Sequence, residues 1–165
     1  MRAAGTVLFL IAGGLCGFWA AARLKKRVTV LAAIRLWIRY METEFRFHAA
    51  PLTEMLAECG EQPALRELTF LRAADGSDAP PQQLSDAVKR EKRALALNDE
   101  DTALLLRLID GLGRTDLLGQ QAHLADCAER FEEQEAQARD TYLRQGKVCR
   151  VTGICTAAAL ALVLW

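Results

Sequence analysis

The stretch of this sequence whose residue types come closest to a chemical site is GLGRTDLLGQQAHL, at positions 111–124. It contains Asp116, Gln120 and His123, and Cys127 follows His123 by four residues. Residues four apart lie on the same face of a helix, so His123 and Cys127 could form a nucleophilic pair. Catalysis by such a pair also needs an orienting third group and an oxyanion site. The sequence provides no recognisable pattern for either, which favours an ordinary helix face.

Other signatures of catalysis or cofactor binding are missing from the sequence. It has no P-loop, no nucleophile elbow and no zinc-protease motif. None of the five cysteines is at CxxC spacing and only two histidines occur, so no set of zinc ligands can be assigned. Glu42 and Glu44 are two residues apart and point to different faces of a helix, which separates their carboxylates. The sequence therefore predicts a protein that is not an enzyme and holds no cofactor or metal.

The charged residues are unevenly distributed along the chain. The 21 Lys and Arg residues balance the 21 Asp and Glu residues, and a net charge of zero argues against a nucleic-acid binder. All acidic residues lie between Glu42 and Asp140. Outside that region lies a basic run: Arg23, Lys25, Lys26 and Arg27. A basic cluster segregated in this way requires its own explanation.

The basic run directly follows twenty uncharged residues, AAGTVLFLIAGGLCGFWAAA. A helix of that length spans about 30 Å, the thickness of a bilayer's hydrocarbon core. A signal peptide is the competing interpretation, but Phe18 and Trp19 occupy the place of a cleavage site and the basic run acts as a stop signal. We therefore expect a retained transmembrane helix over residues 1–22. Its Gly13 and Gly17 form a GxxxG pattern, which can bring a second helix close.

A second uncharged stretch, VTGICTAAALALVLW, closes the chain. Its 15 residues cover about 22 Å as a helix, so we expect the span to include the preceding residues and to run over 148–165. Lys147 and Arg150 stand at its start. Both basic flanks face the middle of the chain, and the positive-inside rule then places residues 23–147 in the cytoplasm and both termini at the outer face. The sequence thus predicts a multi-pass membrane protein with two spans.

The middle of the chain, residues 23–147, is predicted to be all-α. Apolar residues recur there at spacings of three and four, and no segment alternates as a strand would. Pro51 and Pro63 suit the first position of two short helices, Asn98 suits the N-cap of a later helix, and ADGSDAPP, at 74–81, predicts a loop. We expect an antiparallel bundle of about six helices whose first and last members continue into the two spans.

Three details of that bundle are specific enough to test. The helix starting at Pro63 is expected to carry Leu65, Leu68 and Leu71 on its buried face. The next helix is expected to reach Leu95, with the run KREKR at 89–93 as a solvated face. On the long last helix, the expected solvated side chains pair at i,i+4 spacing with Arg130 and Arg139. Those side chains are Glu132, Glu133 and Glu135.

The glycine-rich segment fits a corner between the last two helices better than it fits an active site. Gly111 and Gly113 can supply the left-handed residue that ends the preceding helix. Thr115 or Asp116 can then cap the first turn of the following helix. The polar side chains that we expect to bind backbone or a partner subunit are those of Asp116, Gln120 and His123.

Four features in a fixed order resemble one protein family. They are the glycine-rich first span with its basic end, METEFRFHAAPLTEMLAECG at 41–60, LIDGLGRTDLLGQQAHL at 108–124, and the short closing span. Together they resemble the stage III sporulation protein AB family over essentially the whole chain. The most specific positions are Glu42, Glu44, Pro51, Leu52, Gly111, Gly113, Asp116, Gln120 and His123.

The resemblance implies a function that the residues alone do not specify. Members of this family are components of a secretion-like channel complex around the forespore, and they are similar to the platform proteins of type II secretion and type IV pilus systems. It implies a place in the mother-cell membrane and contacts with the lipid bilayer and with other stage III channel proteins, including a cytoplasmic secretion-type ATPase. Homo-oligomers are left open, and neither nucleic acid nor a small-molecule substrate is implied. The alternative is a membrane-tethered enzyme that uses residues 111–124.

Overall fold

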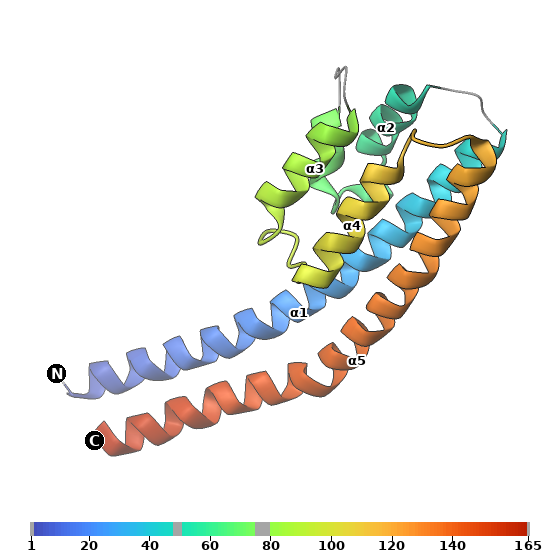
Figure 1. Cartoon of the computed structure of the whole chain (residues 1–165). Coiled ribbons are helices and arrows are strands. Elements are labelled where there is room, and N and C mark those ends of the chain that lie inside the picture. The colour runs from blue at the N-terminus through green and yellow to red at the C-terminus, as the bar shows by residue number, and fades with distance from the viewer. Residues whose placement is uncertain (1, 48–50, 75–79, 165) are drawn as a thin grey trace. The chain divides into compact units, whose positions relative to one another are not determined.

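The structure is a computed structural model that describes the backbone of residues 2–47, 51–74 and 80–164. Side chains are described for residues 17–47, 51–73, 81–116, 118–146, 148, 151 and 152. Every element in these ranges is helical, which confirms the all-α prediction. In chain order they are α1 (Arg2–Phe47), α2 (Leu52–Glu61), the 3₁₀-helices η1 (Pro63–Leu65) and η2 (Thr69–Ala74), α3 (Pro80–Glu91), α4 (Asp99–Gly111) and α5 (Leu117–Leu164) (Figure 1). Of the predicted loop at 74–81, residues 75–79 lie outside the described ranges.

The chain forms two compact units, and both long helices contribute to each of them. Unit 1 comprises Met1–Val28 and Gln137–Trp165, and unit 2 comprises Thr29–Ala136. The side chains of 2–16 and 153–164, which make up most of the two predicted spans, are outside the described set. Among the residues that are described, no helix combines the length and the apolar character needed to cross a membrane.

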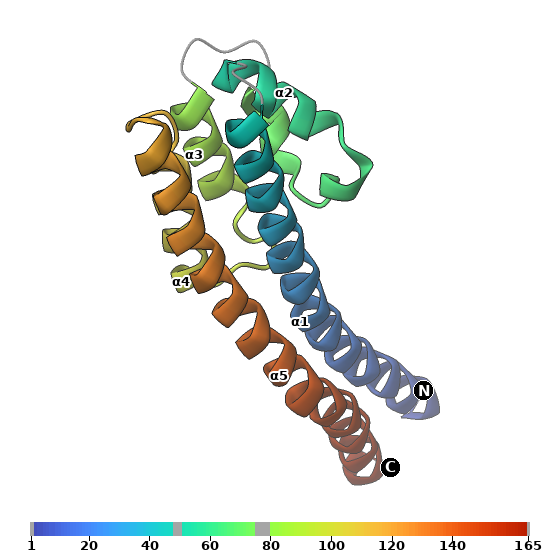
Figure 2. The ribbon, with the colours of Figure 1, turned by 90° about the vertical axis from the view of Figure 1, so that its right-hand side faces the viewer.

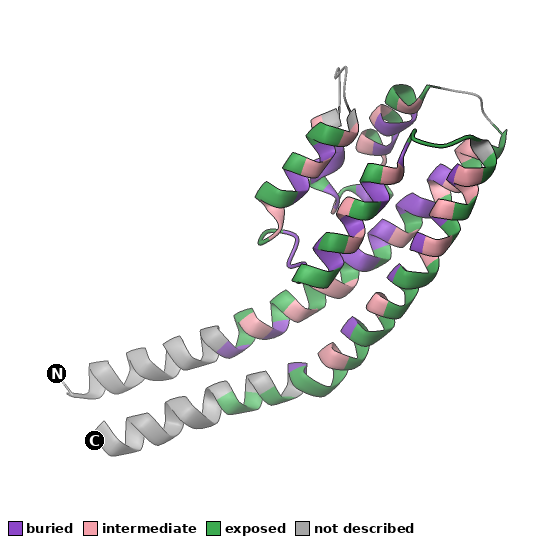
Figure 3. Ribbon diagram, in the orientation of Figure 1, coloured by how far each residue is buried: buried purple, intermediate pink, exposed green. Residues whose placement is uncertain are grey.

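In unit 2, α1 and α5 run in opposite directions and the shorter helices pack beside them (Figures 1 and 2). The buried residues of these helices face one another and the exposed residues face outward (Figure 3). Apart from Asp101, Thr102 and Gln120, the buried side chains of the described residues are apolar. The indole of Trp37 on α1 meets the ring of Phe70 on η2 edge to face, with ring centroids 5.8 Å apart, a favourable aromatic geometry. Further α1 residues that are 1% exposed or less, at the expected helical spacing, are Leu31, Ile34, Ile38 and Met41.

The short helix expected from Pro63 does begin there, but two 3₁₀-helices occupy its place instead of one continuous helix. Leu65, Leu68 and Leu71 are buried as expected, but the chain carries hydrogen bonds from residue i to residue i−3, such as Leu68 N–H to the Leu65 carbonyl at 2.8 Å. A 3₁₀-helix has three residues per turn, so leucines spaced by three stack directly above one another. The same spacing in an α-helix would rotate around the helix surface.

The starts and ends of three other helices show which local signals decide a helix boundary. Pro51 precedes α2 by one residue and has ψ of 143°, so its predicted place as the first helical residue is wrong by one position. Helix α3 ends at Glu91, before Leu95, and a turn follows in which Ala96 has a φ of +57°. Asn98 caps α4 as predicted: its side chain accepts from Asp101 N–H at 2.6 Å, and the Asp101 carboxylate accepts from Asn98 N–H. This reciprocal pair is a capping box.

Candidate functional site

The corner between α4 and α5 is built by side chains of α5 that reach the carboxyl end of α4. Gln120 Nε2 donates to the Gly111 carbonyl at 2.7 Å, and His123 Nε2 lies 3.3 Å from the Leu108 carbonyl. The last carbonyls of a helix have no partner within that helix, and both side chains supply one. Gln120 is only 3% exposed, so its hydrogen bond forms away from competing water.

Gly111 is required at this corner because His123 occupies the space where a side chain would be. A Cβ atom at Gly111 would lie 2.2 Å from His123 Nε2, far inside contact distance. Two residues later Gly113 has a φ of +77°, the left-handed conformation that ends helices and that favours glycine. The left-handed residue that the sequence predicts is therefore Gly113, while Gly111 has a packing role.

Asp116 caps the first turn of α5. Its Oδ1 accepts from Gly119 N–H at 3.1 Å, the bond expected of an N-cap carboxylate. A Cβ at Gly119 would lie 2.9 Å from that same oxygen and 2.8 Å from the Thr115 Cβ. Of the two capping residues that the sequence allows, the structure selects Asp116, and Gly119 leaves room for it.

The segment around Pro51 and Leu52 meets this corner in space. A Cβ at Gly113 would lie 3.4 Å from Leu52 Cδ2, so the first residue of α2 packs at the turn after α4. The two sequence segments that carry the family resemblance thus come together at Leu52 and Gly113. Pro51 is exposed, and its carbonyl accepts from the N–H groups of Glu54 and Met55 at 3.0 and 3.2 Å.

Glu42 and Glu44 lie at the end of α1 and do not share a site. Both are half-buried. Burial raises the pKa of Tyr40 to about 12, with further contributions from its hydrogen bond to Glu58 (2.9 Å) and from the negative charge of Glu44. The hydrogen bond from Tyr40 to Glu58 therefore links α1 to α2 close to Glu44.

The His123 and Cys127 pair lacks the properties of an activated nucleophile. The Cys127 sulfur lies 3.8 Å from His123 Nε2, but burial raises the pKa of the Cys127 thiol, which disfavours the reactive thiolate. The same His123 nitrogen is close to the Leu108 carbonyl. Across the described residues no group of three or more His, Cys, Asp and Glu side chains is placed to hold a metal. The geometry of the corner gives no support to the membrane-tethered enzyme.

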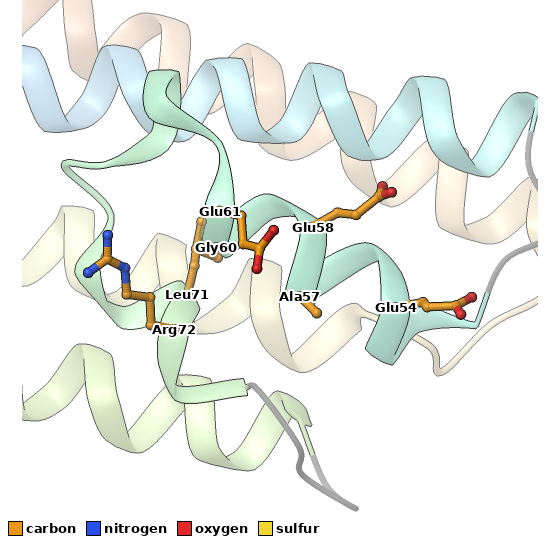
Figure 4. Close-up of a pocket in the computed structure, with 7 residues that line it drawn as sticks. All are labelled: Glu54, Ala57, Glu58, Gly60, Glu61, Leu71 and Arg72. Atoms are coloured by element: carbon orange, nitrogen blue, oxygen red, sulfur yellow. The ribbon is translucent and has the colours of Figure 1, made fainter.

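A mainly acidic groove between α2 and η2 was not foreseen from the sequence. Its volume is about 720 Å³, and its charged lining residues are Glu54, Glu58, Glu61 and Arg72. The three glutamates extend along one side of α2 and Arg72 lies on η2 (Figure 4). Their spacing of four and three residues places the carboxylates on one face of a helix. From this spacing the acidic face of α2 could have been predicted from the sequence.

A second missed feature links α1 to α5 within unit 2. The Arg35 guanidinium donates to Glu135 Oε2 at 2.7 Å and lies 3.2 Å from a Glu132 oxygen. Arg35 and Glu135 side chains are only 22% and 16% exposed, so this pair is better shielded than a surface ion pair. The expected pairing of these glutamates along α5 is wrong, because Arg130 binds Asp126 instead.

Unit 1 shows a reversed pattern of burial, although its two helices lie side by side (Figures 1 and 2). Among its described side chains, the buried ones are small: Gly17, Ala21, Ala138 and Gly146. Five of its large apolar side chains are exposed by 60% or more: Phe18, Trp19, Leu143, Val148 and Val151. Small residues inside and large apolar residues outside are typical of helices packed in a lipid environment.

The basic residues that predict topology lie in the same unit. Arg23, Lys25 and Lys26 are exposed and Arg27 is half-buried, while the side chains of Lys147 and Arg150 are outside the described set. Unit 1 carries nine Lys and Arg against one acidic residue, a net charge of +8. Unit 2 carries twelve Lys and Arg against twenty Asp and Glu, a net charge of −8. The neutral chain is therefore strongly polarised between its two units.

The described fold defines an all-α protein in which an acidic bundle with a capped helical corner is joined by two long helices to a basic, apolar-surfaced unit. A family model described as stage III sporulation protein AB matches residues 2–165, and the chain belongs to this family. The stage III sporulation protein AB of Bacillus subtilis (strain 168) is 22% identical over 169 residues, which cover 99% of each chain. No solved structure matches. The family predicted from the sequence is confirmed.

Proposed function

We propose that this protein is a membrane-anchored, non-catalytic component of the channel assembly that its family serves in stage III of sporulation. The observation that carries the proposal is the family match over residues 2–165. In this account the protein resides in the mother-cell membrane and connects a cytoplasmic secretion-type ATPase to ring-forming envelope proteins. Unit 2 faces the cytoplasm, and both termini lie at the outer face.

The reversed burial of unit 1 supports the membrane part of the proposal. In water, exposing five large apolar side chains while burying glycine and alanine is unfavourable, since apolar area then remains in contact with solvent. In lipid the same arrangement is favourable, because small residues let helices approach closely and apolar chains cover the outside. The uncharged stretches at both ends of the chain and their basic flanks agree with this interpretation.

The contacts that the corner's polar side chains make with the backbone support a role without catalysis. Asp116 and Gln120 are engaged by backbone N–H and carbonyl groups, and His123 lies against a carbonyl. These contacts hold α4 and α5 together, so the polar side chains of the corner serve the packing of the two helices. Protein contacts are then made by the exposed surface of unit 2.

A genetic experiment tests the proposed role. Deleting the gene in the endospore-forming bacterium that carries it should block sporulation after engulfment, and normal spore yield would contradict the proposal. Complementation with Asp116→Ala/His123→Ala separates structure from catalysis. Because both residues act on the fold, this variant should restore spores wherever its bundle still folds. Loss of spores with a fully folded variant would instead favour an enzyme.

Crosslinking in sporulating cells tests the proposed partners. A photoreactive residue at Ala57 reports on the acidic groove, one at Arg90 on the basic run of α3, and one at Glu133 on the outer face of α5. The proposal expects stage III channel proteins, including the ATPase, to be captured from at least one of these positions. Capture of none of them from any position would contradict it.

A further inference from the structure

The basic residues of unit 1 directly adjoin its exposed apolar side chains. Arg23 follows Trp19 by one helical turn, and its guanidinium carbon lies 5.9 Å from the centroid of the indole ring, within range of a cation–π contact. On α5, Leu143 and Arg144 are consecutive and both exposed. Aromatic and basic side chains next to apolar ones are characteristic of the boundary between lipid tails and headgroups.

The charge at this boundary is almost entirely positive. The acidic residue in unit 1, Asp140, accepts a hydrogen bond from Arg144 at 2.8 Å. Lys26 and Arg23 are exposed, and the net charge of the unit is +8. A phospholipid with a net negative headgroup complements this surface, whereas a zwitterionic headgroup carries no net charge to balance it.

We propose that unit 1 selectively binds anionic phospholipids, with Arg23 and Lys26 at the headgroups and Trp19 at the level where the lipid tails begin. This inference rests on the proposed membrane anchoring and goes beyond it, because orientation of a span by its basic flanks requires no selectivity for one headgroup. Each Lys or Arg beside an anionic membrane surface strengthens attraction about fivefold. Several such residues on adjacent turns therefore enrich anionic lipid next to the protein.

Quenching of tryptophan fluorescence by brominated lipids measures this selectivity. The full chain is placed in vesicles of equal parts phosphatidylcholine and phosphatidylglycerol, with bromine on the tails of one lipid or of the other. Trp165 is replaced by phenylalanine in every protein compared, which leaves Trp19 and Trp37 as the two tryptophans. Trp19 is exposed and Trp37 is buried in unit 2, so Trp37 contributes an unquenched background. We expect the quenching to show a preference for phosphatidylglycerol of about threefold or more. Arg23 and Lys26 both attract anionic lipid near Trp19, whereas the entropy of mixing of the two lipids opposes full enrichment.

Two variants with the same change of charge locate the effect. Arg23→Gln/Lys26→Gln should reduce the preference to near one, while Arg90→Gln/Arg93→Gln, at exposed positions of unit 2, should leave it unchanged. Equal quenching by both lipids in the unaltered chain would overturn the selectivity and leave membrane anchoring intact. Quenching by neither lipid would overturn both proposals. An equal loss of preference in the two variants would show a non-specific effect of charge and contradict the assigned site.

Discussion

Most large apolar side chains of unit 2 are buried and most of its charges are exposed, whereas the buried described residues of unit 1 are small and five of its large apolar side chains are exposed. Trp37 in unit 2 is 1% exposed and Trp19 in unit 1 is 68% exposed. Both tryptophans belong to α1, a single continuous helix. The difference shows that one continuous helix can carry two burial patterns, inverted between its segments. The net charges of −8 and +8 follow the same division.

The largest expected effect comes from making the same substitution on both sides of this division. Trp37→Ala removes a fully buried ring that packs against Phe70, and it should lower the free energy of unfolding by about 3–5 kcal/mol. Trp19→Ala should change it by less than about 0.5 kcal/mol, because its side chain is exposed. Urea unfolding in detergent, followed by circular dichroism, measures both. Similar losses for the two variants would contradict the inverted burial.

Gly111 provides a sharper test of packing within unit 2. Gly111→Ala places a methyl group on His123 and should destabilise the protein by about 1–3 kcal/mol. Gly60→Ala is the matched control, since its Cβ would approach Arg72 no closer than 3.8 Å, and it should be neutral or stabilising by about 0.5–1 kcal/mol. Adding His123→Ala to Gly111→Ala removes the clash and should restore part of the lost stability. Full stability of Gly111→Ala alone would refute the corner geometry.

The ion pair between the two long helices has an intermediate expected effect. Glu135→Gln leaves Arg35 with a weaker acceptor and should cost about 1–2 kcal/mol, since hydrogen bonds to charged groups are stronger than neutral ones and partial exposure reduces the gain. Glu133→Gln, at an exposed position of the same helix, should cost less than about 0.5 kcal/mol. Thermal unfolding at low and high salt measures both variants. Equal, small effects would show that the pair contributes little to unit 2.

Alkaline pH should destabilise unit 2 to a smaller extent. Burial raises the pKa of Cys59 to about 12, and burial with the Glu58 hydrogen bond raises that of Tyr40 to about 12. The folded state therefore keeps protons that the unfolded chain releases near pH 9 for the thiol and pH 10 for the phenol. Stability from these groups is complete below pH 9 and is lost as pH rises toward 12. Urea midpoints between pH 8 and 11 should fall less steeply for Tyr40→Phe, and an unchanged slope would count against this assignment.

The helices and the residues that cap their ends could be predicted from the sequence, because interactions between neighbouring residues determine them. The Asn98 cap, the left-handed Gly113 and the Asp116 cap each depend on a few adjacent residues. The type of helix that begins at Pro63 could not be predicted, because leucines spaced by three fit a 3₁₀-helix as well as a short α-helix. Helix periodicity alone does not distinguish these two structures over such a short segment.

Contacts between distant segments could not be predicted from local patterns. Arg35 and Glu135 are one hundred residues apart, and many other acidic residues could have paired with Arg35 in the sequence. The packing of Leu52 at Gly113 likewise appears only when α2 meets the corner. The acidic groove was missed because Arg72, on its far side, comes from a different element. Such sites depend on the tertiary fold, which the spacing of residues within one helix does not specify.

Two exposed phenylalanines on α1 test directly whether unit 1 faces lipid while unit 2 faces water. Phe18 in unit 1 is 64% exposed and Phe47 in unit 2 is 71% exposed, so exposure alone predicts the same surroundings for both. Benzoylphenylalanine is placed at each position in turn, and the full chain is illuminated in native membranes. We expect lipid adducts from position 18 and none from position 47, as read by mass spectrometry of the crosslinked peptides. Lipid adducts at neither position, or at both in equal amounts, would contradict a lipid-facing unit 1 and a water-facing unit 2.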